Sequence, residues 1–298
     1  MRLTHIINPV AARADSHLAK TQTLCLRTIE LALAHARTAA PHLEVDVVCA
    51  IFPEDAGAVP GYCRATGTLM QSLRDQLPGA NPATRKLPLI GEIYQLGHAL
   101  GAGTHLIYTN IDICPQPYFY PLIARLLQDA PAFGITRRNI APEPIALADL
   151  TLMQAQVGSR HQGMDTFVCP RDYVPRFNLE SVCIGLPTIE YALLGQIDAL
   201  SGFQAKLYKH LLANFHHGDD RIWQSDDVAC AFNDQQTTKV LARLKAEYPA
   251  YPAHSLFDWF SAKFSGQRPK AKGLAGKLRD ALRLRPRHPE PFDITSGE

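Results

Sequence analysis

The stretch 104–121, THLIYTNIDICPQPYFYP, constrains the fold of this chain more than any other. It predicts a buried strand over 106–108 that runs into a short polar insert and is stopped by two prolines. Because side chains alternate along a strand, Asn110 and Asp112 are expected on one side of the chain and Ile111 on the other. Ligands of α/β sheets bind beyond the carboxyl ends of the strands. The insert therefore predicts a site for a hard cation and the phosphates that it holds, with a plain polar turn as the alternative.

The segments before this stretch predict a parallel sheet. Residues 3–8 and 44–52 are short apolar runs with β-branched residues, and residues 17–39 between them have helical spacing. A β-α-β start of this kind favours parallel strands joined by a right-handed crossover. A helix over 89–100 and a strand over 105–109 continue the pattern. The expected fold is α/β, with a mostly parallel central sheet flanked by helices.

The rest of the chain is expected to be more irregular and, towards its end, helical. Strands are expected over 132–135 and 166–169, and a strand or turn over 182–185. Helices are expected over 66–77, 118–128, 146–157, a segment ending near 198, 203–215 and two stretches within 236–263.

Composition and motifs exclude several classes of protein. No run approaches the roughly 18 apolar residues of a membrane span, and MRLTHIINPV lacks the apolar region of a secretory signal, so a cytoplasmic location is expected. The 7 cysteines are scattered without C-x-x-C spacing, which disfavours a disulfide framework and a structural zinc site. A net charge of +2 gives no reason to expect nucleic acid as a partner. The absence of G-x-G-x-x-G, P-loop and G-x-S-x-G motifs disfavours dehydrogenases, P-loop NTPases and α/β-hydrolases.

The strand, the letters N-I-D-I-C-P and the aromatic-rich helix start that follows together resemble the metal-binding D-x-D region of GT-A fold glycosyltransferases. The similarity is to bacterial, family 2-like enzymes of this fold, which use a nucleotide-diphospho-sugar as donor. It implies a catalytic domain over 1–225, with a nucleotide-binding half over about 1–115 and an acceptor half over about 116–225. The first acidic position of the motif is Asn110 here, which can coordinate through its carbonyl oxygen but carries no charge.

The resemblance also implies which residues hold the cation and the donor. Mn²⁺ or Mg²⁺ would be bound by Asp112 and Asn110, with His216 or His217 completing the coordination. The residues implied to contact the donor are Asn8, Glu54 from the Glu54-Asp55 pair, Arg85, Lys86, Asn110, Arg137 and Arg138. Arginine suits a diphosphate because its guanidinium can donate two parallel hydrogen bonds. For each of them a solvated loop position is the competing interpretation.

A catalytic base is expected if the enzyme inverts the configuration of the sugar. By the resemblance, Asp165 is the first choice and Asp172 the second, because a carboxylate can accept a proton from the acceptor hydroxyl. The Gly-x-Asp pattern at Asp165 is also common in turns. A retaining enzyme would need no such base.

The C-terminal part changes character. Helices within 226–265 are expected to pack on the catalytic domain, and 266–298 reads as a basic tail. Residues 263–287 contain nine Lys or Arg and one acidic residue, and leucines recur at spacing four within 273–284. A helix there would suit peripheral contact with an anionic membrane on the inner face, and a disordered basic tail is the alternative.

The sequence therefore predicts a glycosyltransferase whose acceptor is an unknown glycan, lipid-linked molecule or small molecule. Two alternatives stay open. One is a non-catalytic nucleotide-sugar binding protein of the same fold, with Asn110 as the sign of a decayed metal site. The other is a metal-dependent hydrolase built on the cluster His216-His217-Gly218-Asp219-Asp220.

Overall fold

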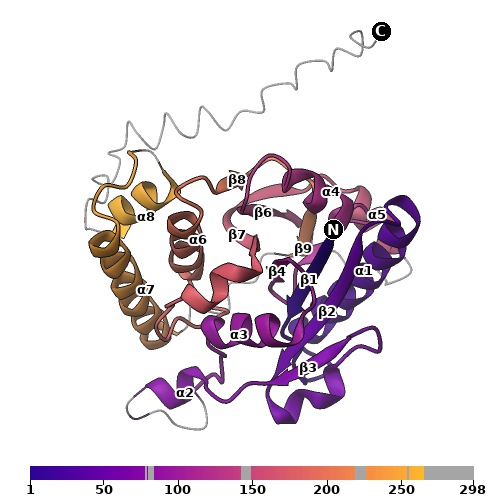
Figure 1. Ribbon diagram of the computed structural model, residues 1–298. Coiled ribbons are helices and arrows are strands. Elements are labelled where there is room, and N and C mark those ends of the chain that lie inside the picture. The colour runs from indigo at the N-terminus through magenta and orange to yellow at the C-terminus, as the bar shows by residue number, and fades with distance from the viewer. Residues whose placement is uncertain (78, 80–83, 142–148, 219–225, 254, 265–298) are drawn as a thin grey trace, which may run out of the picture. The chain divides into compact units, whose positions relative to one another are not determined.

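The computed structural model describes residues 1–77, 79, 84–141, 149–218, 226–253 and 255–264 (Figure 1). The chain divides into two compact units, Met1–Ser261 and Ala262–Glu298. The first unit contains the sheet, its flanking helices and every candidate residue discussed below, apart from those in undescribed segments. The expected basic tail lies outside the described residues.

In the described part of the chain, nine strands form one mixed sheet in the order β3-β2-β1-β4-β7-β6-β9-β5, and β8 also pairs with β6. The strands are β1 Arg2–Ile7, β2 Glu44–Ile51, β3 Ala65–Thr68, β4 His105–Thr109, β5 Cys114–Pro115, β6 Phe133–Ile140, β7 Ser159–Pro170, β8 Lys206–Tyr208 and β9 Asn214–His217. Strands β1 to β4 are parallel, as the β-α-β start predicts. Strand β7 runs antiparallel to both of its neighbours, β4 and β6.

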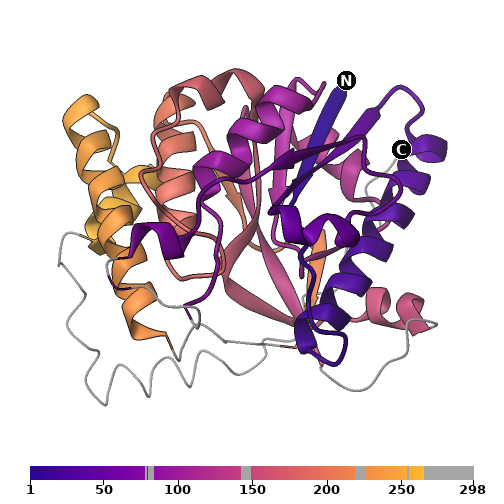
Figure 2. The ribbon, with the colours of Figure 1, turned by 90° about the horizontal axis from the view of Figure 1, so that it is seen from below.

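Helices cover both faces of the sheet (Figures 1 and 2). They are α1 His17–Ala39, α2 Leu73–Gln76, α3 Ile90–Leu100, α4 Phe119–Leu126, α5 Leu150–Ala155, α6 Ile189–Leu200, α7 Asp227–Glu247 and α8 Leu256–Phe264. Leu3 and Ile7 of β1 share a buried core with α1 and α4, whereas Ile6 meets Gly97 of α3 on the other face. Every residue of β1 after Arg2 is buried, as expected of a central strand that is covered on both faces. Helix α6 packs on β6 and β7, and α7 packs on α6.

The strand directions bring several chain segments together beyond the carboxyl ends of the strands. Strands β4, β6 and β9 point the same way, so their carboxyl ends lie together with the start of the antiparallel β7. The turn after β4, the end of β6, the end of β9 and the first half of β7 therefore lie at this end of the sheet. The sequence predicts the site at this end of the sheet, beyond the carboxyl ends of the strands.

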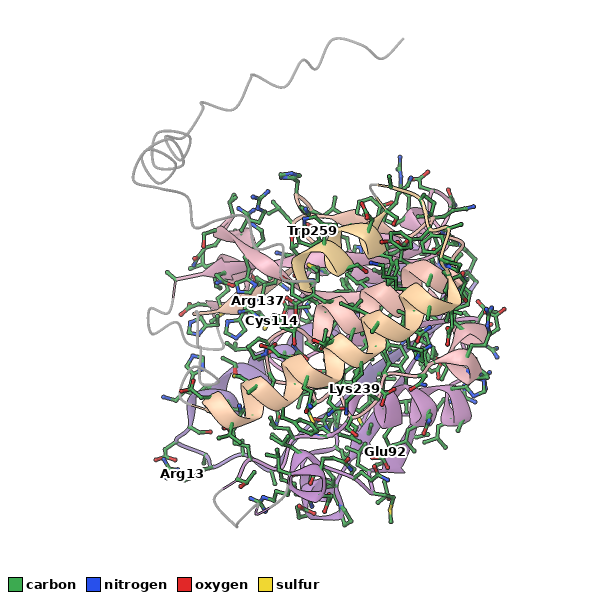
Figure 3. All side chains as sticks on the ribbon, turned by 90° about the vertical axis from the view of Figure 1, so that its left-hand side faces the viewer. Arg13, Glu92, Cys114, Arg137, Lys239 and Trp259 are labelled. Atoms are coloured by element: carbon green, nitrogen blue, oxygen red, sulfur yellow. The ribbon has the colours of Figure 1, made fainter. Side chains whose placement is uncertain are left out.

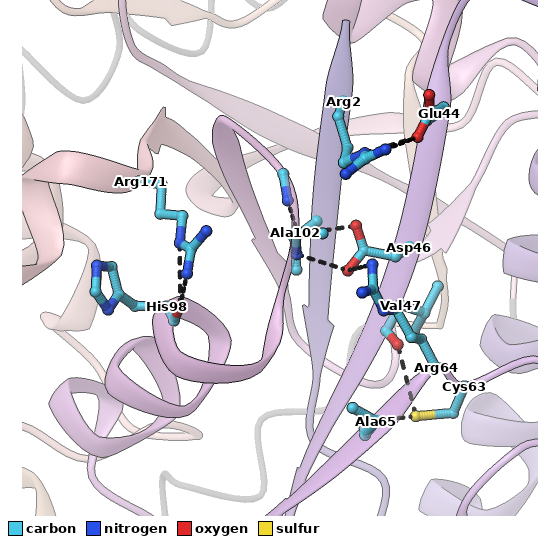
Figure 4. Close-up of polar contacts among 12 residues, drawn as sticks. Arg2, Glu44, Asp46, Val47, Cys63, Arg64, Ala65, His98, Ala102 and Arg171 are labelled. Carbon is cyan, nitrogen blue, oxygen red and sulfur yellow. Dashed lines mark hydrogen bonds and ion pairs between the residues drawn. The ribbon is translucent and has the colours of Figure 1, made fainter.

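Polar contacts connect the chain segments at the opposite end of the sheet, near the amino ends of β1 and β2 (Figure 4). Asp46 of β2 accepts hydrogen bonds from Thr4 Oγ1 at 3.0 Å and from the backbone N–H of Ala102 at 3.2 Å. Arg64 lies 3.8 Å from the same carboxylate. Arg171 Nε donates to a backbone carbonyl of α3 at 3.0 Å. These contacts tie β1, β2 and the end of α3 together.

Two expected helices are corrected by the structure. The segment 66–77 begins with β3, which pairs with β2, and only the short α2 is helical. The segment 203–215 forms β8 and the start of β9, both of which pair with β6. In both places the exposed edge of a neighbouring strand provides hydrogen bonds that local propensity does not register. Strand β7 is also much longer than expected, so Asp165 lies within a strand and not in a turn.

No helix in the described part of the chain combines the length and the apolar character that crossing a membrane requires.

Candidate functional site

The polar insert after β4 forms a turn. The backbone N–H of Ile113 donates to the carbonyl of Asn110 at 3.1 Å. Asn110 and Asp112 therefore do not alternate as in an extended strand, and they contact different partners. Ile111 and Ile113 bury their side chains and anchor the turn against the core.

Asp112 lies against His216. Asp112 Oδ2 is 3.3 Å from His216 Nε2, and the histidine is 2% exposed. Strand β9 carries His216 to this position because it pairs with β6 on one side and with β5 on the other. His216 Nδ1 lies 2.9 Å from the carbonyl of Gly218, and a carbonyl can only accept, so Nδ1 carries the proton. Nε2 therefore faces the carboxylate.

The two groups stabilise each other's charge. Burial by itself raises the pKa of Asp112 and lowers the pKa of His216. The hydrogen bond and the opposite charge that they share outweigh burial, so the pKa of Asp112 is lowered and that of His216 is raised. Asp112 Oδ1 is buried and has no hydrogen-bond partner among the described residues. The pair thus keeps one carboxylate oxygen unsatisfied.

A buried ion pair lies beside it. Arg137 Nη1 donates to Asp165 Oδ1 at 3.0 Å, and the two side chains are 10% and 8% exposed. Arg137 Nε donates to Asn139 Oδ1 at 2.9 Å. Figure 3 labels Arg137, which is buried, and Arg13, which lies at the edge of the molecule. The pairing of β6 with β7 is irregular here: Ile135 pairs with Thr166 and Thr136 with Met164, so Asp165 is the extra residue of a β-bulge, and its carboxylate reaches Arg137.

Asp165 keeps one oxygen without a partner. Its Oδ2 is buried and unbonded among the described residues, with His161 Nδ1 at 3.8 Å. The charge of Arg137 also acts on Asp112 and His216, so the two carboxylates belong to one electrostatic cluster. The turn after β4, the ends of β6 and β9 and the middle of β7 therefore meet in this cluster.

Asn110 turns towards the sheet. Tyr108 donates its hydroxyl hydrogen to Asn110 Oδ1 at 2.9 Å. Tyr108 itself is fully buried and stacks on Phe167 with ring centres 6.3 Å apart. The oxygen that was expected to coordinate a cation thus accepts a hydrogen bond from a core tyrosine.

Candidates at the ends of β1 and β2 have contacts of their own. Asn8 is buried and donates to the carbonyl of Ala50 at 2.6 Å, which joins the two strand ends. Glu54 pairs with Lys86, whose Nζ also lies 4.0 Å from the centre of the Phe52 ring. The hydrogen bond from Lys86 lowers the pKa of the exposed Glu54.

Arg85, Arg138 and His217 contact other parts of the chain than the buried ion pair. Arg85 Nη1 donates to the carbonyl of Gly185 at 3.4 Å. Arg138 donates to two backbone carbonyls before β7, each at 2.8 Å. His217 stacks on His17 of α1 with ring centres 6.2 Å apart, and the ring of His216 lies 6.4 Å from the same His17. His216 differs in that it also pairs with Asp112.

Asp172 lies at the other end of β4. It follows β7 in the 3₁₀ helix Arg171–Arg176, and Pro170 at the end of β7 pairs with His105 at the start of β4. Asp165 by contrast precedes Thr166, which pairs with Thr109 at the end of β4. At roughly 3.3 Å per residue, β4 separates the two ends by about 13 Å. The structure therefore brings Asp165 to the cluster and leaves Asp172 away from it.

The sequence patterns did not select three polar residues that lie near the candidate site. His161 reaches Asp165 only through the irregular pairing of β7. His5, at the centre of β1, is fully buried between Tyr120 Oη and Thr109 Oγ1, each at 2.9 Å. In the sequence, Tyr108 looks like an ordinary core aromatic residue.

Of the Glu54-Asp55 pair, Asp55 is the buried member, and its Oδ1 accepts a hydrogen bond from the backbone N–H of Ala11 at 2.7 Å.

Asp112 and His216 fit a divalent cation as two ligands. Asp112 offers an unsatisfied oxygen. Because the carbonyl of Gly218 holds the proton on Nδ1, His216 would bind a cation through Nε2 once the proton that Nε2 shares with Asp112 is released. No group of three or more His, Cys, Asp or Glu able to hold a metal occurs among the described residues, and Asp219 and Asp220 of the expected hydrolase cluster lie outside them. A cation held here would take its other ligands from the bound donor or water.

The sequence matches no protein-family model and no curated protein. The fold, however, is similar to that of solved structures of TarS from S. aureus. TarS 1-349 in complex with UDP-GlcNAc superposes with a TM-score of 0.54 at 9% identity, covering 89% of this chain and 72% of that chain. TarS 1-349 without that ligand gives 0.52 at 10% identity, covering 94% and 77%. The complex with UDP gives 0.51 at 8% identity, covering 96% and 76%.

The chain has a GT-A-type fold. This agrees with the mixed α/β sheet flanked by helices and confirms the fold class that the sequence predicts. At identities near 10% the similarity concerns the fold, and the chemistry of the residues has to come from the site itself.

Proposed function

We propose that this chain is a glycosyltransferase that moves a sugar from a nucleotide-diphospho-sugar to an acceptor. The observation that carries the proposal is the Asp112–His216 pair at the carboxyl end of β4, beside the buried Arg137–Asp165 pair. The fold supports it, because a structure of the same fold, TarS 1-349, is in complex with UDP-GlcNAc. Opposite charges buried together at a sheet edge are costly unless they serve a ligand or a tight structural role.

Asp112 and His216 are the residues that would hold Mn²⁺ or Mg²⁺. When bound, such a cation neutralises charge on the diphosphate of the donor. Asp112 supplies the anionic oxygen, and His216 supplies a neutral nitrogen once its proton has left. Asn8, Glu54, Arg85, Lys86 and Arg138 stay candidates for donor contact, although the described contacts of each are with other parts of the chain.

Arg137 is the buried cation of the proposed site. Hydrogen bonds to Asp165 and Asn139 fix its guanidinium before any ligand arrives. A fixed positive charge stabilises negative charge that develops on the leaving diphosphate, with little reorganisation during the reaction. Arg137 therefore supports the departure of the nucleoside diphosphate.

Asp165 is the proposed general base if the enzyme inverts. The acceptor hydroxyl oxygen forms a bond to the anomeric carbon while the bond from that carbon to the phosphate oxygen breaks. The diphosphate leaves with the electron pair, and the hydroxyl proton passes to Asp165. Its buried, unbonded Oδ2 supports this role, and Arg137 provides the counter-ion that a base needs to carry negative charge in a buried position. Asp172, at the far end of β4, is the weaker candidate.

A thermal-shift screen with UDP-, GDP-, CDP- and dTDP-sugars, with and without Mn²⁺, tests the proposal. A ligand that binds only the native state raises its melting temperature. Release of the nucleoside diphosphate from the stabilising donor, measured without acceptor, tests for chemistry. If no donor stabilises the chain in either condition, the proposal is wrong.

The second candidate is a non-catalytic nucleotide-sugar binding protein. It is favoured by Asn110, which stands where the motif has an acidic residue and whose oxygen is engaged by Tyr108. Stabilisation by a donor without any release of nucleoside diphosphate, and without transfer in an acceptor screen, would support it.

A further inference from the structure

Two cysteines lie in contact on the face of the sheet that α1 covers. Cys49 is a residue of β2 and is fully buried in the core that this strand shares with α1. Cys63 precedes β3 in the chain and is partly exposed. The two side chains share a hydrogen bond. The pair therefore joins one thiol that solvent reaches to one that it does not.

The backbone around the pair holds the sulfur of Cys63 beside β2. Cys63 Sγ lies 3.6 Å from the carbonyl oxygen of Val47 and 3.0 Å from that of Ala65 (Figure 4). Thr66 pairs with Cys49 across the two parallel strands, and its Oγ1 lies 3.9 Å from Cys63 Sγ. Because paired residues on neighbouring strands share a face of the sheet, Cys63 Sγ lies on the same face as the side chain of Cys49.

The turn that carries Cys63 is fixed on both sides. The backbone N–H of Cys63 donates to the carbonyl of Pro60 at 3.0 Å, and that of Arg64 donates to the carbonyl of Val47 at 2.8 Å. Tyr62 donates its hydroxyl hydrogen to the carbonyl of Leu26 in α1 at 2.9 Å. The two thiols thus meet in the folded chain through contacts with both β2 and α1.

The shared hydrogen bond makes the two thiols chemically different. It is the largest cause that lowers the pKa of Cys63, to about 6, and it raises the pKa of Cys49. A thiolate is the form of cysteine that attacks peroxides, and it reacts where reagents can reach it. Cys63 meets both conditions. Cys25 and Cys114, another pair of neighbouring cysteines, are fully buried, and burial raises the pKa of each.

We propose that Cys63 is an oxidation-sensitive thiol that forms a reversible disulfide with Cys49, with a peroxide as the oxidant. The Cys63 sulfur attacks a peroxide oxygen, the O–O bond breaks, and hydroxide leaves a sulfenic acid behind. The sulfur of Cys49 then bonds to that of Cys63, the S–O bond breaks, and water leaves with the proton of Cys49. Two electrons pass from the sulfur atoms to the peroxide, and a dithiol reductant returns them.

The bond would close a loop around residues 50–62. This segment contains the 3₁₀ helix Pro53–Ala58, and with it Glu54 and Asp55. A disulfide restricts the unfolded chain, so the oxidised protein should be the more stable form. Formation of the bond does not depend on the proposed function, although the enclosed segment carries Glu54, a candidate for donor contact.

Peroxide treatment of the full chain, followed by alkylation of the remaining thiols and peptide mapping, tests the proposal. We expect a disulfide-linked pair of peptides that contain Cys49 and Cys63, and none that links Cys25 to Cys114. Oxidation should raise the melting temperature by roughly 3–6 °C, and dithiothreitol should reverse the rise. Cys230→Ser removes the other partly exposed cysteine and is the matched control, which should respond as wild type does. Cys63→Ser should not respond.

The rate at which iodoacetamide labels Cys63 as the pH is varied gives a second measurement. We expect a midpoint near pH 6 in wild type and one near the ordinary value of 9 in Cys49→Ala, because the partner thiol is then missing. A midpoint near 9 in wild type would overturn the inference. So would peptide maps in which peroxide leaves both thiols free to be alkylated or links Cys63 to another cysteine. Both of these results come from wild type, so they hold even if a cysteine variant fails to fold.

Discussion

His5 shows how burial sets the chemistry of a single residue. It lies at the centre of β1, is fully buried and is bonded on both ring nitrogens, to Tyr120 and Thr109. Burial lowers its pKa from 6.5 to about 3. Thr109 is the last residue of β4, directly before the turn that carries Asn110 and Asp112. The buried hydrogen bonds of His5 therefore support the strand end on which the candidate site is built.

The first prediction follows from that pKa. The unfolded chain binds a proton at His5 below pH 6.5, and the folded chain does so only near pH 3. Stability from this residue is therefore complete above pH 6.5 and is lost as the pH falls, by about 1.4 kcal/mol per pH unit. Urea unfolding between pH 5 and 7.5 checks this against His5→Gln. The variant should be less stable at pH 7, and the difference should shrink as the pH is lowered; parallel curves would contradict the assignment.

The second prediction concerns the buried ion pair. Arg137→Met leaves the Asp165 carboxylate buried without its counter-ion, so we expect a loss of about 3–5 kcal/mol in the free energy of unfolding. Asp165→Asn in that background removes the uncompensated charge and should recover a large part of the loss. Urea denaturation of both single variants and the double variant gives the coupling energy. Additive effects would mean that the two side chains do not interact as the structure shows.

Single residues also show where sequence reasoning stops. Asp112, His216 and Asp165 could be selected from motif letters and from resemblance, and the structure places all three in one electrostatic cluster. Whether they act as proposed stays a prediction. The roles of Tyr108 and His161 could not be selected, because one depends on an amide orientation and the other on irregular strand pairing. Neither leaves a local pattern.

At the scale of elements, close packing of α3 on β1 gives the third prediction. A Cβ built on Gly97 would lie 2.1 Å from Ile6 Cδ1, whereas a Cβ on Gly91 of the same helix would meet its nearest neighbour, Leu179 Cβ, at 3.9 Å. In Gly97→Ala the buried Ile6 side chain must change its rotamer or the helix must shift, and either should cost about 1–3 kcal/mol. Gly91→Ala is the matched control and should stabilise by about 0.5–1 kcal/mol through helix propensity. Thermal and urea unfolding compare the two, and equal stability of both variants would contradict the packing.

Helices and strands could be predicted where the hydrophobic pattern of their own residues is typical of that structure. Strands β1, β2 and β4 and helices α1 and α3 are buried runs or amphipathic stretches, and the structure has them close to the expected bounds. Segments 66–77 and 203–215 were expected to be helical, but their strands form because β2 and β6 present open edges to them. The partner of β3 is 17 residues away (Val48 with Ala65) and that of β8 is 73 residues away (Phe133 with Lys206), so neither pairing can be read from a local window of the sequence.

At the scale of the whole molecule, the proposed site joins segments from across the first unit. It uses the turn after β4, the ends of β6 and β9 and the middle of β7, which are consecutive in space and scattered in sequence. A ligand that contacts all of them binds only the folded unit. Its binding free energy therefore adds to the stability of the unit as a whole.

This coupling gives the fourth prediction. UDP with Mn²⁺ at a hundredfold excess over its dissociation constant should raise the free energy of unfolding by about 2.7 kcal/mol. Asp112→Asn removes the anionic oxygen beside His216 and should abolish most of that gain. Asp172→Asn makes the same chemical change on an exposed side chain at the opposite end of β4 and should keep the gain in full. Melting curves of both variants with and without UDP and Mn²⁺ make the comparison. A gain that Asp112→Asn keeps would place the nucleotide elsewhere, whereas loss in Asp112→Asn alone locates it at the carboxyl end of β4, where the strand directions of a GT-A-type sheet gather the charged side chains.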